Sequence, residues 1–432
     1  MDIGSISLIL LVAILFLLTL GVPLGFATGL LGMGLAFYQF GDPGLSIALQ
    51  RVYGLTTSYV FLSVPLFIFM ATMLERGGIA KEMYDSMKVW VGGVRGGVAI
   101  TTIVMAVLLA AMSGIIGGEI VLLGLVALPQ MLRLGYNQNL AIGAICASGS
   151  LGAMIPPSIV LIIYGLVSET SIHALFSAAI VPGLMLGASY VAYVVIRCAI
   201  NPSLAPDVDS GDPIPLMSKL KQSKGLVAPL LVVFVVLGSI YGGITSITEA
   251  AAMGALGIIV ITAIRGELSV SMVKASLDQT FRSMGAILWV TFGATIFTGA
   301  YTLSGGPDYV ASGILGFDLP PLGVIGLIVL VFLLLGMFMD WIGIVLLCMP
   351  VFIPIVLQLG YDPVWFGVLF CMTMQIAFLS PPFGPAAFYL KSVTPPEITL
   401  MDIYKSFLPF VAIQIAVLSV VLLFPEVVTV FL

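Results

Sequence analysis

Two apolar stretches of this chain carry, near their centres, residues that open a helix and expose oxygen atoms. The first, residues 138–165, contains a Ser-Gly-Ser run and then Pro156-Pro157. The second, residues 362–389, repeats the pattern at a constant offset, with Pro381-Pro382 in the equivalent place. Carbonyl and hydroxyl oxygens at such a break can hold a hard, weakly bound cation such as Na⁺, and the free N–H groups of half-helices suit an anion. The paired breaks therefore predict the binding region of an ion-coupled transporter.

Each broken stretch follows a long apolar block with a polar or glycine-rich centre, at about 98–128 and 322–351. Ser113 lies at the centre of the first block and Asp340 at the centre of the second. Such a block can enter and leave the membrane on one side, as a re-entrant hairpin. Non-helical backbone at that depth is tolerated only where protein or a water-filled cavity covers it. We therefore expect a hairpin tip to face each helix break.

The residues at these tips and breaks that offer oxygen atoms are the candidates for binding sodium. They are Ser113, Gly114, Ser148, Gly149, Ser150 and Gly152 in the first half of the chain, and Gly336, Met339, Asp340, Thr373, Gln375 and Ser380 in the second. The candidates for binding a solute are Ser113, Ser158, Asp340 and Gln375. The plainer interpretation of the small residues is close helix packing, which is common in membranes. Packing alone accounts less well for two clusters at matched positions.

Asp340 and Glu119 are the acidic residues placed deepest in the two predicted hairpins. A carboxylate within the membrane is costly, and its presence favours a functional role. Asp340 suits a cation or a hydroxyl group of a solute. Two positions are open for Glu119, either deep in the hairpin or past its tip in contact with water. No Lys or Arg is predicted in the core, so helix ends and hydroxyl groups are expected to hold an anionic solute.

The sequence does not contain the residue sets of the common enzyme classes. It has no Ser/His/Asp set, no HExxH motif and no Walker loop. The chain is therefore predicted not to be an enzyme and to need no cofactor, with Na⁺ as its coupling ion. Without a motif for ATP hydrolysis, uphill transport would have to draw on an ion gradient. Nothing in the sequence predicts binding of nucleic acid.

The composition is that of an integral membrane protein. The chain is 60% hydrophobic and only 8% charged, whereas soluble domains carry about 25% charged residues. Apolar runs of about 20 residues recur along the chain, which favours spanning helices over the alternating strands of a barrel. Membrane lipids are therefore expected to surround it.

The predicted fold class is an all-α polytopic membrane protein, an inverted repeat of two five-span halves, each with a re-entrant hairpin and a broken helix. Spans are expected at about 4–22, 23–40, 57–75, 138–165 and 177–199, and at about 225–242, 245–264, 284–302, 362–389 and 406–428. Residues 1–200 form the first repeat, 201–224 a cytoplasmic linker and 225–432 the second repeat. Segments 41–56 and 265–283 mix charged and apolar residues and are expected to lie along the membrane interface as arms.

The distribution of basic residues supports this topology. With ten spans, two hairpins and an external N-terminus, all of the 15 Lys and Arg residues except Arg51 fall on the cytoplasmic side. Such an excess is the usual positive-inside bias. If either hairpin were a full span, every later loop would change sides of the membrane, and the basic residues would no longer gather on the cytoplasmic side. Five spans separate equivalent positions, so the second half is inserted upside down, and both termini are predicted to be external.

Several longer motifs, taken together, indicate a protein family. They are GVPLGFATGLLG at 21–32, MSGIIGGEIVLLGLVALPQMLRLGY at 112–136, IPPSIVLIIYG at 155–165, ITSITEAAAMGALG at 244–257 and FLSPPFGPAAFYLKSVTPPE at 378–397. With these motifs, nearly the whole chain resembles the large membrane subunit (DctM type) of tripartite ATP-independent periplasmic (TRAP) transporters.

The resemblance implies an elevator mechanism, in which hairpins and broken helices carry solute and Na⁺ past a fixed scaffold. It implies two partners, a small four-helix membrane subunit of the DctQ type and a periplasmic substrate-binding protein of the DctP type. It also implies location in the bacterial inner membrane and import of a small organic solute that bears a carboxylate. The sodium sites of the family match the tips and breaks named above.

Two departures from the family pattern affect local geometry. The first tip of the family often reads Ser-Gly-Ser followed by small residues, and Ile115 and Ile116 take the place of the second Ser and the next small residue here. Residues 247–250 read Ile-Thr-Glu-Ala where the family has Pro first. A sodium/anion symporter of the divalent-anion type, acting without a binding protein, is the alternative function. A channel and an intramembrane enzyme are other classes, and the enzyme would need a nucleophile and base at depth, which the sequence does not place there.

Overall fold

A computed structural model describes residues 1–91, 94–114, 116–205, 217–219, 223–317 and 319–430. These residues form helices and no strand, which confirms the prediction of an all-α protein. Six of the described helices are long and apolar enough to cross a membrane, and further apolar helices have 10–17 residues. The predicted linker lies largely outside the described residues, because residues 206–216 and 220–222 are not among them.

The first half of the chain begins with three helices, α1 (Ile3–Thr19), α2 (Leu24–Phe40) and α3 (Asp42–Thr56). It continues through η1 (Tyr59–Leu62), α4 (Ser63–Arg76), α5 (Ile79–Val91), α6 (Gly97–Ser113), α7 (Gly118–Val126) and α8 (Leu128–Arg133). It ends with α9 (Gln138–Gly149), η2 (Ser150–Ala153), α10 (Ile159–Val167), α11 (Ile172–Ile200) and η3 (Pro202–Leu204).

The second half begins with α13 (Lys224–Tyr241), α14 (Ile247–Ile264), α15 (Val270–Leu303) and α16 (Gly306–Leu315). It continues with α17 (Pro321–Gly336), α18 (Trp341–Gln358), α19 (Pro363–Leu379) and α20 (Pro385–Lys391). It ends with α21 (Leu400–Leu423) and α22 (Glu426–Thr429).

The two stretches with Pro-Pro pairs are interrupted helices. Residues 150–158 separate α9 from α10, and residues 380–384 separate α19 from α20. Each gap contains its pair, Pro156-Pro157 or Pro381-Pro382, and both Pro-Pro bonds are cis. Proline has no N–H to donate and disfavours a helical residue before it, so the helix cannot run through.

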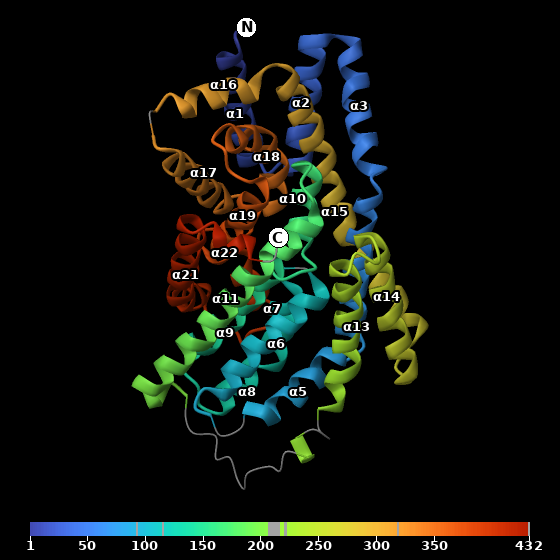
Figure 1. Cartoon of the computed structure of the whole chain (residues 1–432), viewed down its shortest axis with the longest axis vertical. Coiled ribbons are helices and arrows are strands. Elements are labelled where there is room, and N and C mark those ends of the chain that lie inside the picture. The colour runs from blue at the N-terminus through green and yellow to red at the C-terminus, as the bar shows by residue number, and fades with distance from the viewer. Residues whose placement is uncertain (92–93, 115, 206–216, 220–222, 318, 431–432) are drawn as a thin grey trace.

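Contacts between the two halves are reciprocal. In Figure 1, α2, α3, α14 and α15 gather on one side, and α19, α21 and α22 lie on the other. α2 packs against α15 while α14 packs against α4, and α10 packs against α18 while α20 packs against α7. In the same way α9 packs against α21, and α11 packs against α19. A contact between an element of the first half and one of the second half is thus matched by a contact between the equivalent elements with the halves exchanged.

α15 differs from what the sequence predicts. An interfacial segment at 265–283 and a separate span at 284–302 were expected, but α15 is one unbroken helix of 34 residues. No proline occurs within it, and its lone glycines cannot end a helix by themselves. A Cβ atom on Gly293 would clash with the Gly25 carbonyl of α2. Glycines therefore let these two helices cross closely, as small residues do in membrane proteins.

The missing proline at the start of α14 is replaced by a capping box. Ser246 Oγ accepts a hydrogen bond from the Glu249 backbone N–H at 3.3 Å, and Glu249 Oε2 accepts one from the Ser246 N–H at 2.7 Å. This reciprocal pair satisfies two N–H groups that the helix start would leave free. The helix therefore has a defined start without proline.

Candidate functional site

The first hairpin tip lies against the first helix break. α6 ends at Ser113, and Gly114 follows with φ 59, in the left-handed region that favours glycine. The Gly114 carbonyl accepts a hydrogen bond from the Ile159 N–H at the start of α10, at 3.3 Å. A side chain at Gly114 would clash with the Pro157 carbonyl. The fold thus brings Ser113 and Gly114 beside the Pro-Pro pair.

The second tip lies against α19, shortly before the second break. A Cβ atom on Gly336 would clash with the Ala377 side chain. Asp340 precedes α18 in an extended conformation, and its side chain makes no capping hydrogen bond. Gly336, Met339 and Asp340 line a cavity of about 10 Å³, together with Ile116 of the first tip. A space of this size accommodates about one water-sized occupant.

The close approach of Gly336 to α19 leads to a stability prediction. Gly336→Ala is expected to lower the free energy of unfolding by about 1–3 kcal/mol, because the added methyl group overpacks the contact with Ala377. Gly326→Ala on the same helix is the matched control, since nothing lies within 4 Å of a Cβ atom there. The control should be neutral or stabilising by up to about 1 kcal/mol. Unfolding of the purified protein measures both, and equal stabilities would contradict the prediction.

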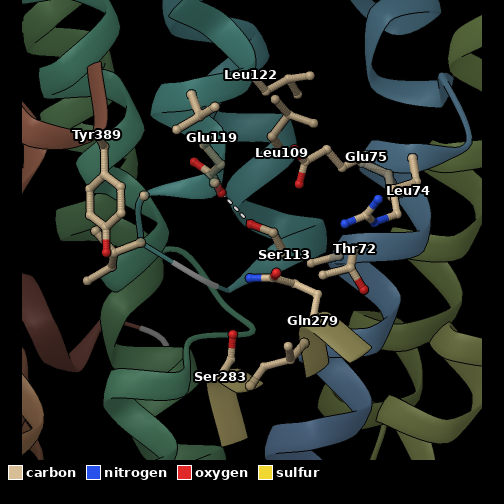
Figure 2. Close-up of a pocket in the computed structure, with 17 residues that line it drawn as sticks. Thr72, Leu74, Glu75, Leu109, Ser113, Glu119, Leu122, Gln279, Ser283 and Tyr389 are labelled. Carbon is tan, nitrogen blue, oxygen red and sulfur yellow. Dashed lines mark hydrogen bonds between the residues drawn. The ribbon is translucent and has the colours of Figure 1, made fainter. Parts of the chain in front are cut away.

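A larger cavity of about 360 Å³ lies between the first hairpin and the helices α4 and α15. This volume falls in the range of small-molecule sites. Figure 2 shows Ser113 and Glu119 between Tyr389 on one side and Thr72 and Glu75 on the other. The lining residues are Ile68, Ala71, Thr72, Leu74, Glu75 and Arg76 of α4, Leu109 and Ser113 of α6, Ile116 and Gly117 of the tip, Gly118, Glu119, Val121 and Leu122 of α7, Gln279 and Ser283 of α15, and Tyr389 of α20.

Glu119 is buried deep in the hairpin. It lies just past the tip, in the first turn of α7, and is only 4% exposed. Ser113 Oγ donates a hydrogen bond to Glu119 Oε1. Glu119 Oε2 is buried and has no hydrogen-bond partner among the described residues. One oxygen of Glu119 is therefore held by Ser113, and the other is buried without a partner among the described residues.

Arg76 is an exposed residue that was not predicted to line a site. It is the last residue of α4, and it lines the cavity next to Glu75. Gln279 and Ser283, four positions apart on α15, were also missed. Their spacing of four predicts that they lie on one helix face. The sequence does not predict which helix that face contacts.

The hydroxyl groups at the breaks bond to their own helices. Ser148 Oγ donates to the Ala144 carbonyl at 2.6 Å, and Ser150 Oγ donates to the Ala147 carbonyl at 2.7 Å. Thr373 Oγ1 and Ser380 Oγ each donate, at 2.7 Å, to the α19 carbonyl four residues earlier. Ser158 Oγ donates to the Ala153 carbonyl and caps α10. Each oxygen keeps a lone pair that a cation could use.

The other predicted residues are buried in helix contacts. A Cβ atom on Gly149 would clash with Ile120 of α7, and Gly152 is buried within η2. Gln375 is fully buried in α19, and neither of its amide atoms has a hydrogen-bond partner among the described residues. Ser150 Oγ accepts a hydrogen bond from Gln414 Nε2 of α21 at 3.3 Å.

The four predicted solute-binding residues do not share one cavity. Ser113 lines the larger cavity, and Asp340 lines the smaller one. Ser158 and Gln375 line neither of these two. Ile116 lines both cavities, so the first tip separates them.

Interrupted helices, paired hairpin tips and helices of membrane-spanning length define the class as polytopic helical membrane proteins. The crystal structure of the Alcanivorax borkumensis YdaH transporter has a similar fold, with a TM-score of 0.60 over 89% of each chain. The sequence identity is 18%, so this likeness concerns the fold alone.

Residues 11–427 match the family described as the tripartite ATP-independent periplasmic transporter, DctM component. The chain belongs to this family. It is 30% identical over 380 residues to the C4-dicarboxylate TRAP transporter large permease protein DctM of Pseudomonas aeruginosa, covering 87% of each chain. It is 29% identical over 415 residues to the sialic acid TRAP transporter large permease protein SiaM of Vibrio cholerae, covering 95% of this chain and 94% of that protein. The resemblance predicted from the motifs is confirmed, and the chain is a transporter permease, not an enzyme.

Proposed function

We propose that this chain is the large membrane subunit of a sodium-coupled importer of a small organic solute that bears a carboxylate. It works in the bacterial inner membrane as a multi-pass protein with both termini on the periplasmic side. A small four-helix membrane subunit is its stable partner, and a periplasmic binding protein delivers the solute. Membership of a tripartite family favours this function over that of a symporter without a binding protein.

The observation that carries the proposal is the larger cavity beside the first hairpin tip. Its wall combines Ser113 and Glu119 of the hairpin with Arg76 of α4, and it has room for a small solute. Arg76 offers a planar guanidinium, which suits a carboxylate. The two relatives compared above are named for C4-dicarboxylates and sialic acid, both of which bear carboxylates.

Sodium coupling is supported by oxygen atoms at both tips and breaks. The Gly114 carbonyl lies beside the first break, and Asp340 lines the small cavity at the second tip. Na⁺ is a hard cation that prefers oxygen ligands, and opened helices supply them in secondary transporters. Among the described residues, no group of three or more His, Cys, Asp or Glu could hold a transition metal.

An inverted repeat and an elevator motion are supported by the packing. Reciprocal contacts such as α10 with α18 and α20 with α7 are the contacts expected of two copies related by a two-fold axis. The larger cavity is lined by α6, α7 and α20 together with α4 and α15, and α4 also packs against α6. In the proposed motion α6, α7 and α20 move with the solute, while α2 and α15, which cross closely at Gly25 and Gly293, belong to the fixed scaffold.

Thermal unfolding of the purified chain in NaCl against KCl tests the coupling ion. At equal ionic strength, Na⁺ is expected to raise the unfolding temperature, because a ligand that binds only the folded state stabilises it by mass action. Choline chloride serves as a second control for general salt effects. Identical unfolding temperatures in NaCl and KCl would contradict sodium binding.

A further inference from the structure

A separate cavity of about 220 Å³ lies where the start of α9, the end of α11 and the start of α21 meet. It shares no residue with the two cavities described above. Arg197 lies in the last turn of α11, and Lys405 lies in the second turn of α21. The full lining is Asn137, Asn139, Leu140, Tyr193, Arg197, Leu204, Lys405, Ser406, Pro409 and Phe410.

The charge of the two cations in this cavity is only partly offset by the described part of the chain. No acidic residue lines the cavity, and neither Arg197 nor Lys405 forms a salt bridge with a described carboxylate. Asp402 lies one turn before Lys405, and its carboxylate attracts the Lys405 ammonium. The same carboxylate caps α21 by accepting hydrogen bonds from the Thr399 N–H at 3.0 Å and hydroxyl at 2.6 Å. The side chains of Arg197 on α11 and Lys405 on α21 therefore place two positive charges at one cavity.

Neutral groups add donors around the two charges. Ser406 Oγ donates to the Asp402 carbonyl at 2.7 Å and more weakly to the Asn139 side-chain oxygen at 3.3 Å. The amide N–H groups of Asn139 are further donors. The Asn137 side-chain oxygen already accepts from the Asn139 and Leu140 N–H groups at 3.0 and 3.2 Å. The capped start of α9 therefore adds only the partial positive charge of its helix dipole. The anion-attracting groups are the two cationic side chains and the Asn139 amide.

We propose that this cavity binds a phosphate group. A guanidinium forms paired hydrogen bonds with phosphate oxygens, and a lysine ammonium adds a compact charge beside them. Arg197 and Lys405 are also both at helix ends on the side where the basic residues of the chain are predicted to gather, which is the level of lipid headgroups. Leu140, Pro409 and Phe410 supply an apolar wall that would suit the glycerol and first methylene groups of a phospholipid. The phosphate can thus come from an anionic phospholipid or from a soluble phosphate.

A phosphate group bound in this cavity would connect α9, α11 and α21, which lie near the two breaks. α9 leads into the first break, and α21 packs against both α9 and α19. A ligand held by α11 and α21 across the start of α9 stabilises this folded arrangement by mass action. This site does not depend on the nature of the transported solute or of the coupling ion.

Thermal unfolding of the full chain in nanodiscs provides the test. One arm compares phosphatidylglycerol with phosphatidylcholine nanodiscs, and a second adds inorganic phosphate to phosphatidylcholine nanodiscs. A rise in unfolding temperature in the first arm only identifies a lipid headgroup, and a rise in the second identifies soluble phosphate. No rise in either arm overturns the proposal.

Variants assign the effect to this cavity. The double variant Arg197→Gln, Lys405→Gln is expected to lower apparent affinity for the ligand found above by about tenfold or more, which is about 1.4 kcal/mol. Lys81→Gln with Lys274→Gln removes the same charge from the predicted cytoplasmic side, outside the cavity, and should keep the affinity. Arg197→Lys keeps the charge but not the paired hydrogen bonds, so an intermediate loss is expected. If both double variants lose affinity equally, binding is general charge attraction and the proposed site is wrong.

Discussion

Replacing Asp340 by Asn is expected to raise the Na⁺ concentration for half-maximal thermal stabilisation by about 10- to 150-fold. A hydrogen bond or ligand contact to a charged group is worth about 1.5–3 kcal/mol, and each 1.4 kcal/mol is about tenfold in affinity. Asn has nearly the same shape and caps a helix start as well as Asp does. The start of α18, where Asp340 makes no capping hydrogen bond, should therefore remain intact.

A sodium titration at constant ionic strength, balanced with KCl, measures this effect. Asp308→Asn is the matched control, because Asp308 is an exposed acid in the first turn of α16, away from both cavities. The control should titrate as the unchanged protein does. Overlapping curves for Asp340→Asn and the unchanged protein would place this carboxylate outside the cation site.

Replacing Ser113 by Ala is expected to destabilise the protein by about 1.5–3 kcal/mol, because it removes a hydrogen bond to a buried carboxylate. Both oxygens of Glu119 would then lack a partner in the described structure. In a Glu119→Gln background the same change should cost only about 0.5–1.5 kcal/mol, since the acceptor is neutral. The difference between the two costs is the coupling energy of the pair.

A double-mutant cycle measured by chemical unfolding in micelles gives this coupling energy. Ser189→Ala is the control, because Ser189 Oγ donates to the Met185 carbonyl of its own helix at 2.7 Å. That change should stay within about 0.5 kcal/mol of the unchanged protein. If Ser113→Ala costs the same with Glu or Gln at position 119, the two side chains are not coupled and Glu119 is not held by Ser113.

The positions of the helix interruptions could be predicted because their cause is local. Pro156-Pro157 and Pro381-Pro382 remove backbone donors wherever they occur, and Gly114 takes a backbone conformation that other residues avoid. The membrane class followed from composition, and the family followed from motifs spread over most of the chain. None of these inferences required knowledge of which helices touch.

The larger cavity could not be predicted because it depends on such contacts. Glu75 and Arg76 lie at the end of α4. Gln279 and Ser283 lie on α15, which was predicted as two segments with a boundary between residues 283 and 284. Periodicity is a weak guide here, because lipid tails are as apolar as a protein interior. A face turned to lipid and a face turned to another helix therefore have similar sequences.

By itself, the sequence determined that this protein is helical, lies in a membrane, belongs to its family and has paired proline interruptions. Those properties depend on composition and on backbone chemistry within a few residues. The tertiary structure alone decided that Glu119 is buried against Ser113, that Arg76 reaches a cavity, and that Arg197 and Lys405 share another. Contacts between distant helices depend on close packing at a few small residues, such as Gly25 and Gly293, and local sequence does not reveal which partner they meet.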